Sequence, residues 1–336
     1  MILTILSSSF ICIVSILILR IAAQSLNLID RPDYRKKHEE PIPMIGGLAI
    51  YISLVLTSLL FKLPYILDIL IFSSSIVLII GLLDDIFNLG IIIRLIAQII
   101  ASLVVIFSGL LVVDIGNIST LGLISMGTFS GIFTIFAVIS LTNAFNFIDG
   151  LDGLAGGLVL IALISLIIFQ YSEVGIRDPE IIIILFSSVL VYWLINMSYT
   201  PLKKIFLGDS GSLLLGFLVS WLLIYYAHPD VRTFHPVLVL WCVTIPVFDI
   251  TSVVIRRLVT RNNVFLPDLS HIHHLILKLG YSKQFTLWII LLSGVLFSFL
   301  GFFSYKLFGP GSSLLLFFIF LTLYCFVSYN FMKKVI

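Results

Sequence analysis

The chain has 336 residues, of which 60% are hydrophobic and only 11% are charged, with a formal net charge of +2 at pH 7. No soluble domain of this size could bury so much apolar surface, so the composition excludes soluble proteins and predicts an all-α, polytopic integral membrane protein. The three cysteines lie in apolar runs, are too scattered for a zinc motif and give no sign of a disulfide framework.

Apolar stretches of roughly 17–22 residues, the length that a bilayer core demands, predict about eleven transmembrane helices. The first, from Ile2 to Ala23, is too long for a signal peptide and is expected to be retained. Nothing indicates a separate soluble domain, so a single transmembrane domain is expected over residues 1–336. In chain order the predicted cores are 2–23, 45–61, 66–83, 94–111, 130–147, 154–171, 181–199, 213–227, 236–256, 284–304 and 314–332.

The positive charges give these helices an orientation. When the predicted spans alternate, one side receives fifteen of the nineteen Lys and Arg residues and the other side only four, so the positive-inside rule makes the first side cytoplasmic. The N-terminus is then outside and the C-terminus inside. The four basic residues on the outer side are Lys62, Arg177, Arg232 and Lys306.

Four polar clusters interrupt the apolar chain, and the same alternation places all of them on the cytoplasmic side. They end the third span, join the fifth to the sixth, open the eighth and follow the ninth. A carboxylate at the edge of a bilayer is costly, so a chain that gathers five there needs a cation, a substrate or both. We therefore expect a cytoplasm-facing site built from loops 24–44, 84–93, 143–153, 200–212 and 257–283.

The first cluster is Asp84-Asp85, which closes the run IVLIIGLLDD. Neighbouring side chains on a helix point about 100° apart, so we expect one carboxylate to hold a metal while the other meets the substrate. The alternative is a solvated helix end. However, two acids at a helix C-terminus oppose the macrodipole unless something cationic binds.

The second cluster, NAFNFIDGLD, has Asn143, Asn146, Asp149 and Asp152 at three-residue spacing, which places them on one face if the stretch is helical. A row of amide and carboxylate groups suits a hydrated Mg²⁺ or the polar edges of a nucleotide. The alternative is a polar capping loop, where Asn and Asp are common.

The third cluster, Gly208-Asp209-Ser210-Gly211-Ser212, opens the eighth span. One interpretation makes Asp209 the cap of the helix N-terminus. The other uses the same N-terminus to bind an anion or a phosphate-bound metal. Lys203 and Lys204 lie just upstream and by themselves indicate topology.

The fourth cluster, His271-Ile272-His273-His274, lies in a loop that also carries Arg256, Arg257 and Arg261. A zinc site and a passive surface are the alternatives. A loop this basic favours contact with phosphate or sugar, because imidazole and guanidinium groups donate hydrogen bonds to phosphoryl oxygens.

Two further features stand beside these clusters. The first cytoplasmic loop carries Arg35-Lys36-Lys37, which suits either anionic lipid and topology or the phosphate of a bound lipid. Asp249 lies inside the ninth span, where an acid is expected to face the bundle interior, either paired structurally or near the site.

Together the acids and the basic loop predict a metal-dependent phosphoryl-transfer site, with Mg²⁺ as the expected cofactor and Mn²⁺ as the alternative. Two carboxylates about 4 Å apart repel by roughly 4 kcal/mol at an effective dielectric of 20. A divalent ion removes that repulsion and stabilises charge building on a pyrophosphate. An ion-coupled transporter is the alternative from another class. It predicts acids near mid-bilayer and two related halves, whereas in this chain only Asp249 is expected to lie deep and no clear repeat is found.

The motifs LLDD, NAFNFIDGLDGLAGG, FLGDSGSLLLGF and HIHH, in this order, resemble those of the polyprenyl-phosphate N-acetylhexosamine-1-phosphate transferases (glycosyltransferase family 4). The resemblance covers most of the chain, from the first cytoplasmic loop to the histidine loop. Within the family, PVFDITSVVIRRL followed by PDLSHIHH is most similar to the bacterial branch that uses N-acetylglucosamine. The peptidoglycan translocase branch usually has three consecutive histidines, which Ile272 interrupts here.

The resemblance implies a reaction in the bacterial cytoplasmic membrane. Undecaprenyl phosphate attacks the β-phosphorus of a UDP-N-acetylhexosamine, releases UMP and forms the first lipid-linked intermediate of a cell-surface glycan. UDP-N-acetylglucosamine is the expected donor, and a 6-deoxy or galacto UDP-N-acetylhexosamine is the alternative. The resemblance implies no nucleic-acid partner and leaves a homodimer open.

Motif by motif, the resemblance also implies roles for individual residues. The catalytic residues would be Asp84, Asp85, Asp149, Asp152 and His273. The Mg²⁺ ligands would be Asp209, Asp85 and Asp149. The substrate-binding residues would be Arg35, Lys36, Lys37, Arg94, Asn143, Asn146, Lys203, Arg256, Arg257, His271 and His274.

Overall fold

The structure is a computed structural model that describes residues 1–31, 40–118, 122–261 and 270–335, and apart from two small sheets its elements are helices. Within these residues, seven helices are long and apolar enough to cross a membrane. Two more apolar helices, α2 (Gly46–Ser58) and α4 (Ile91–Phe107), are shorter. The expected all-α polytopic membrane protein is confirmed at this level, while the eleven spans and their orientation stay predictions.

The contacts divide the chain into two compact units, and each is described by itself. Unit 1 comprises residues 1–109 and 178–218, and unit 2 comprises residues 110–177 and 219–336. Helix α8 (Gly208–Ala227) contributes its first half to unit 1 and its second half to unit 2. The expected single domain stays a prediction.

Unit 1 is a bundle of helices with one short antiparallel sheet. Helix α1 packs against α2 and α7, α2 also packs against α7, and α3 packs against α4. Besides α2, α4 and the first half of α8, its elements are α1 (Ile2–Ala22), β1 (Ile29–Asp30), β2 (Ile42–Pro43), α3 (Tyr65–Phe87) and α7 (Pro179–Asn196).

Small polar residues make the interface between α1, α2 and α7. The Ser53 hydroxyl donates a hydrogen bond to the Ser8 carbonyl oxygen over 2.7 Å, and Ser188 Oγ lies 2.9 Å from Ser53 Oγ. Small side chains let membrane helices approach closely, and the pairing satisfies hydroxyl groups where lipid offers no partner.

Unit 2 consists of helices and the antiparallel hairpin β3–β4. Helix α10 packs against α5 and α12, α11 packs against α12, and α9 packs against α6 and α12. Besides the second half of α8, its elements are β3 (Asp114–Asn117), β4 (Leu123–Ser125), the 3₁₀ turn η2 (Gly127–Phe129), α5 (Ser130–Ile148), α6 (Leu154–Glu173), α9 (Val237–Cys242), α10 (Thr244–Val259), α11 (Ile272–Lys278) and α12 (Lys283–Val335).

The prediction of one continuous helix over 236–256 is wrong. Val243, with φ −126° and ψ 30°, separates α9 from α10. Pro246 explains the break, because it has no N–H to donate to the carbonyl group of Cys242 four residues earlier. The region that leads into Asp249 therefore starts a new helix.

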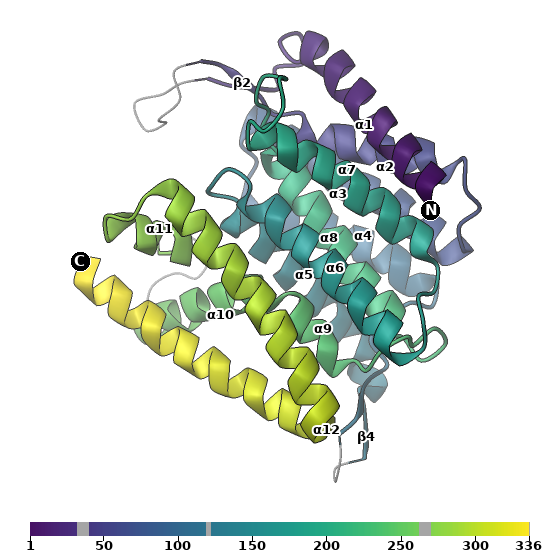
Figure 1. Ribbon diagram of the computed structural model, residues 1–336, viewed down its shortest axis with the longest axis vertical. Helices are drawn as coiled ribbons and strands as arrows, with labels where there is room; N and C mark the ends of the chain where they lie inside the picture. Colours follow the sequence, from purple (N-terminus) through teal and green to yellow (C-terminus); the bar gives the residue numbers. More distant parts are fainter. Residues whose placement is uncertain (32–39, 119–121, 262–269, 336) are drawn as a thin grey trace. The chain divides into compact units, whose positions relative to one another are not determined.

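Helix α12 is also broken, at a place that the sequence indicated. Gly309 has φ 80° and ψ 177°, and Pro310 follows it. These residues fall between the predicted spans 284–304 and 314–332, and the chain turns there into a second arm that leads to the C-terminus (Figure 1).

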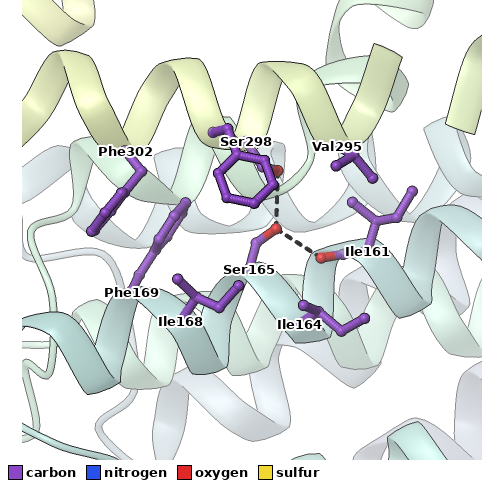
Figure 2. A pocket seen from close by; sticks show the side chains of 9 residues that line it. Ile161, Ile164, Ser165, Ile168, Phe169, Val295, Ser298 and Phe302 are labelled. Carbon is purple, nitrogen blue, oxygen red and sulfur yellow. Dashed lines mark hydrogen bonds between the residues drawn. The ribbon is translucent and has the colours of Figure 1, made fainter. Parts of the chain in front are cut away.

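An apolar cavity of about 80 Å³ lies between α6 and the first arm of α12. Figure 2 shows Ser165 of α6 and Ser298 of α12 facing each other there, with 2.9 Å between their hydroxyl oxygens. Beside them the rings of Phe169 and Phe302 stack at a centroid distance of 5.5 Å. Its walls carry none of the four polar clusters, so the cavity belongs to helix packing.

Candidate active site

Asp84 is the first acid of the LLDD motif and lies buried in the last turn of α3, with 5% of its surface exposed. Its carboxylate accepts hydrogen bonds from the Leu89 N–H over 2.7 Å and from Arg94 Nη1 over 2.6 Å. Its carbonyl oxygen accepts the N–H of Asn88, which has a left-handed φ of 52°. Asp84 therefore ties the end of α3 to the start of α4, and the alternative of a solvated helix end is wrong for this residue.

Asp85, its neighbour, is directed at the N-terminus of α8. Its Oδ1 accepts the Asp209 N–H over 2.7 Å, and its Oδ2 accepts the Ser210 N–H over 3.1 Å. These N–H groups belong to the first turn of a helix, where they have no intrahelical partner. The positive end of the helix dipole in turn stabilises the carboxylate. Asp85 thus caps α8, a role that the sequence suggested for Asp209.

Asp209 and Arg94 complete this group. Arg94 Nη1, which binds Asp84, also lies 3.8 Å from Asp209 Oδ2. The Asp209 side chain is 47% exposed, so it can meet a ligand from the surrounding solvent. Unit 1 therefore brings three predicted acids and one predicted basic residue into a single group, the unit 1 acidic group, which consists of Asp84, Asp85, Asp209 and Arg94.

Two glycines explain why this sequence can place α3 and α8 so close together. A methyl group on Gly81 would overlap the Cα of Ser210, so any larger residue would push the helices apart. Gly208 has a φ of +76°, and a side chain on it would stand 2.6 Å from Asp85 Oδ2. Glycine takes such a φ readily and leaves room for the carboxylate.

The three carboxylates of the unit 1 acidic group supply oxygen ligands, which are the kind that Mg²⁺ prefers. Among the residues that the structure describes, no group of three or more His, Cys, Asp or Glu side chains could hold a metal by itself. Mg²⁺ is usually bound through one or two carboxylates and completed by water and substrate phosphates. The unit 1 acidic group fits an ion bound in that way.

In unit 2, the polar cluster NAFNFIDGLD straddles the end of a helix. Asn143 and Asn146 lie in the last turns of α5, whereas Asp149 is the first residue beyond it, with ψ 54°. Asp152 lies in the turn before α6. The expectation of one helical face for all four is therefore wrong. Glycines break the helix there, and Gly153 takes a φ of 76° at the start of α6.

His273 lies against this same turn. Its ring is fully buried, neither ring nitrogen has a hydrogen-bond partner, and a methyl group on Gly150 would overlap its Nε2. Burial, with smaller contributions from the neighbouring His274 and His271 and against the opposing effect of Asp249, lowers the pKa of His273 to about 3. The ring is therefore neutral at pH 7. The contact between Gly150 and His273 also shows that the NAFNFIDGLD motif and the histidine motif meet in unit 2.

His271 is bound by an acid that the sequence analysis noted without assigning. Asp249 Oδ2 lies 2.7 Å from His271 Nδ1, and Asp249 Oδ1 accepts the Ile272 N–H over 2.9 Å. Tyr324 of α12 donates its hydroxyl proton to the same Oδ1 over 3.2 Å. Both Asp249 and His271 are buried. Asp249 is therefore paired, and its partner His271 is one of the predicted site residues.

Arg256, predicted to bind substrate, is buried and bound to the protein. Its Nη1 donates to Ser328 Oγ over 3.2 Å, and its Nη2 donates to the Ser270 carbonyl oxygen over 2.9 Å. Arg256 thereby holds α10, α12 and the residue before His271 together. Its predicted contact with substrate, and that of the equally buried Arg257, stay predictions.

The other predicted basic residues lie at the periphery or outside the described part of the chain. Arg35, Lys36 and Lys37 fall outside the described residues. Lys203 is exposed, and its Nζ lies 3.7 Å from the Glu40 carboxylate. The acids of the site are divided as well, since Asp149 and Asp152 belong to unit 2. Their convergence with the unit 1 acidic group stays a prediction.

Several partners in these networks were not predicted from the sequence. Among them are Tyr324 and the backbone N–H groups of Leu89 and Ser210. Tyr324 lies in an apolar run like many other aromatic residues, so no pattern marks it. Every residue except proline has a backbone N–H group, so no residue type in the sequence marks such a donor. The cost of Asp249 inside an apolar span was the one available sign.

Comparison with known proteins places this chain in a family. Residues 67–227 match the profile of the family described as Glycosyl transferase family 4. A Haemophilus influenzae protein named undecaprenyl-phosphate alpha-N-acetylglucosaminyl 1-phosphate transferase is 33% identical over 289 residues, which cover 84% of this chain and 81% of the relative. The chain belongs to glycosyl transferase family 4.

Two further relatives of this glycosyl transferase family 4 member carry the same name. The Pasteurella multocida protein is 35% identical over 277 residues, which cover 80% of this chain and 77% of the relative. The Escherichia coli K12 protein is 31% identical over 288 residues, which cover 84% of this chain and 78% of the relative. The family resemblance of the four motifs is confirmed, and the alternative of an ion-coupled transporter is not favoured.

Proposed function

We propose that the protein transfers N-acetylglucosamine 1-phosphate from UDP-N-acetylglucosamine to undecaprenyl phosphate and releases UMP. The observation that carries this proposal is the 33% identity to a Haemophilus influenzae protein named for that transfer, over 81% of its length. The unit 1 acidic group supports it, because phosphoryl transfer depends on groups that bind cations and phosphates.

In this reaction an oxygen of the lipid phosphate attacks the β-phosphorus of the donor. A new P–O bond forms, the bond from the β-phosphorus to the bridging oxygen breaks, and UMP leaves with the electron pair. A phosphate monoester has a second pKa of about 6, so the nucleophile is largely ionised at neutral pH. No base has to remove a proton first, and the work of the enzyme is positioning and charge stabilisation.

The unit 1 acidic group is proposed to bind the charged end of the substrates. Asp84 holds Arg94 in place, and the Arg94 guanidinium is proposed to contact phosphate oxygens. Asp85 and Asp209, with Asp149, are the proposed ligands of Mg²⁺, with Mn²⁺ as the second candidate. When bound, the ion neutralises negative charge that builds on the pyrophosphate.

Unit 2 is proposed to bind the nucleotide sugar. Amide and carboxylate groups at the end of α5 suit the polar edges of the nucleotide, and the histidine motif suits the sugar and its phosphate. The residues proposed for these contacts are Asn143, Asn146, Asp152, His271, His273 and His274.

The proposed setting is the cytoplasmic membrane, which the chain crosses eleven times with its N-terminus outside. The excess of Lys and Arg on one side supports this orientation. The nucleotide sugar is a cytoplasmic metabolite, so the site has to open to that side. The other basic residues of the predicted substrate-binding set lie on the same side and are proposed to favour anionic substrates: Arg35, Lys36, Lys37, Lys203, Arg256 and Arg257.

The test is a comparison of donors with the purified protein. Undecaprenyl phosphate is supplied with UDP-N-acetylglucosamine, UDP-N-acetylgalactosamine or a 6-deoxy UDP-N-acetylhexosamine, and UMP release and lipid-linked product are measured. We expect the highest kcat/KM with UDP-N-acetylglucosamine and no turnover for Asp209→Asn. A product formed only from another donor corrects the sugar, and no product from any donor rejects the function.

A further inference from the structure

Asp249 is the feature of unit 2 that the proposed function leaves without a role. It lies in α10, is 2% exposed, and is engaged by three donors from two other segments. His271 Nδ1 is 2.7 Å from Oδ2, while the Ile272 N–H and the Tyr324 hydroxyl reach Oδ1 over 2.9 Å and 3.2 Å. A buried carboxylate with this many partners is in a fixed position.

The arrangement determines which nitrogen of His271 carries a proton. An ionised carboxylate only accepts hydrogen bonds, so the nitrogen that faces it has to donate. That nitrogen is Nδ1. Nε2 is then the ring nitrogen left for a substrate. With the proton on Nδ1, Nε2 of the neutral ring carries the lone pair and accepts a hydrogen bond from a hydroxyl or amide N–H group.

We propose that Asp249 is a positioning residue that orients His271 and keeps its Nδ1 protonated, so that the Nε2 lone pair can accept a hydrogen bond from a hydroxyl or amide N–H group of the nucleotide sugar. The substrate named here rests on the proposed function, whereas the state of the ring does not. Asp249 acts through His271 and touches no reacting atom. The Ile272 N–H and the Tyr324 hydroxyl hold the carboxylate at the angle that the ring requires.

Asp249→Asn tests this proposal with little change of shape. The Ile272 N–H can only donate, so the amide oxygen has to stay at the place of Oδ1, and the amide NH₂ then faces His271 Nδ1. A donor at that place requires an unprotonated Nδ1 and moves the ring proton to Nε2. The variant keeps the hydrogen bonds but reverses the tautomer.

The first measurement is the state of the ring, which does not depend on activity. Two-bond ¹H–¹⁵N correlation spectra of histidine-labelled protein in detergent report which nitrogen of each of the six imidazoles is protonated. The signals of His271 are those absent from His271→Gln. We expect a protonated Nδ1 in the wild type and an unprotonated Nδ1 in Asp249→Asn. An unprotonated Nδ1 in the wild type overturns the proposal, even if the variant does not fold.

The second measurement is a double-mutant cycle on kcat and KM for the nucleotide sugar. Asp249→Asn should lower kcat/KM by about 10–100-fold, the range found when the orienting partner of a metal-binding histidine is lost. In a His271→Gln background the same change should have an effect below about 2-fold. Losses that multiply, or an Asp249→Asn variant within about 2-fold of the wild type, overturn the proposal.

A matched control separates this effect from the loss of any buried charge. Asp114 of β3 is also buried, and its carboxylate binds Arg232 over 2.7 Å in another part of unit 2. Asp114→Asn should lower the melting temperature and leave kcat/KM and the His271 signals of folded protein unchanged. Wild-type protein without activity toward any donor rejects the proposed function alone, because the spectra still test the ring.

Discussion

Asp85 in unit 1 and Asp249 in unit 2 use a carboxylate in the same way. Asp85, on α3, accepts N–H groups from the first turn of α8, and Asp249, on α10, accepts the first N–H of α11. Helix caps usually come from the residue next to the helix, and losing one costs about 0.5–2 kcal/mol. Here the cap comes from another helix, so each carboxylate fixes the spacing between two elements as well as its own position.

Gly150 gives a prediction at the residue scale. It has no positive φ, so the nearby His273 Nε2 is what excludes a side chain. Gly150→Ala should displace the His273 ring, cost about 1–3 kcal/mol of stability as an overpacked core does, and lower turnover. Thermal unfolding and the transferase assay measure both effects.

Gly131 of α5 is the matched control for this change. Nothing lies within 4 Å of a methyl group built there. Gly131→Ala should leave activity unchanged and stabilise the protein by up to about 1 kcal/mol, because alanine is the better helix former. Equal behaviour of the two variants would contradict the contact between Gly150 and His273.

His273 gives a prediction about pH. Its pKa is about 3 in the folded protein, whereas an imidazole of the unfolded chain titrates near 6.5. Below pH 6.5 the unfolded state binds the extra proton, so stability falls as the pH decreases toward 3. From pH 7.5 to 5.5 the loss is about 1.4 kcal/mol. Melting temperatures across this range should fall less steeply for His273→Gln, and parallel curves would disprove the buried neutral ring.

Individual residues were predictable where an acid interrupts an apolar run. Asp84, Asp85, Asp209 and Asp249 stand out because carboxylates in an apolar chain need partners. The nature of those partners was not predictable. The N–H groups that bind Asp85 come from residues more than a hundred positions away, and any residue type except proline would supply them. The sequence therefore indicated the acids and left their division of labour open.

At the scale of elements, Gly81 is one of the two glycines on which the contact between α3 and α8 depends. Gly81→Ala would place a methyl group against the Ser210 backbone, which cannot rotate away as a side chain can. We expect α3 and α8 to separate, the hydrogen bonds of Asp85 to lengthen, and stability to fall by about 1–3 kcal/mol with a loss of activity. Thermal unfolding and turnover are again the measurements.

Gly90, just before α4, serves as the control because a methyl group there has nothing within 4 Å. Gly90→Ala should behave like the wild type in both measurements. A Gly81→Ala protein with wild-type melting and activity would mean that α3 and α8 are not in close contact in the membrane.

Most helices were predictable because the length and composition of an apolar run decide them. The errors lie where one residue overrides the run. Pro246 breaks the predicted span 236–256 into α9 and α10, and the glycines after α5 end the helical face of NAFNFIDGLD. The start of α8 was also predicted too late. The polar GDSGS residues form its first turn, although the predicted core began only at residue 213.

For the whole molecule, the proposed orientation is open to a direct test. Green fluorescent protein fused to the C-terminus should fluoresce, because it folds in the cytoplasm. Alkaline phosphatase should be inactive there and active when fused after Gly175, between the predicted sixth and seventh spans. The reverse pattern would disprove the orientation drawn from the basic residues.

The fixed positions of the carboxylates in the unit 1 acidic group also affect the rate of catalysis. Backbone N–H groups hold the carboxylates of Asp84 and Asp85 in place, so these side chains have little rotamer freedom left to lose when a substrate binds. That ordering happens once, as the chain folds, and need not be repeated in each catalytic cycle. Such rigidity favours strong binding of the transition state, and it limits adaptation to donors of different shape.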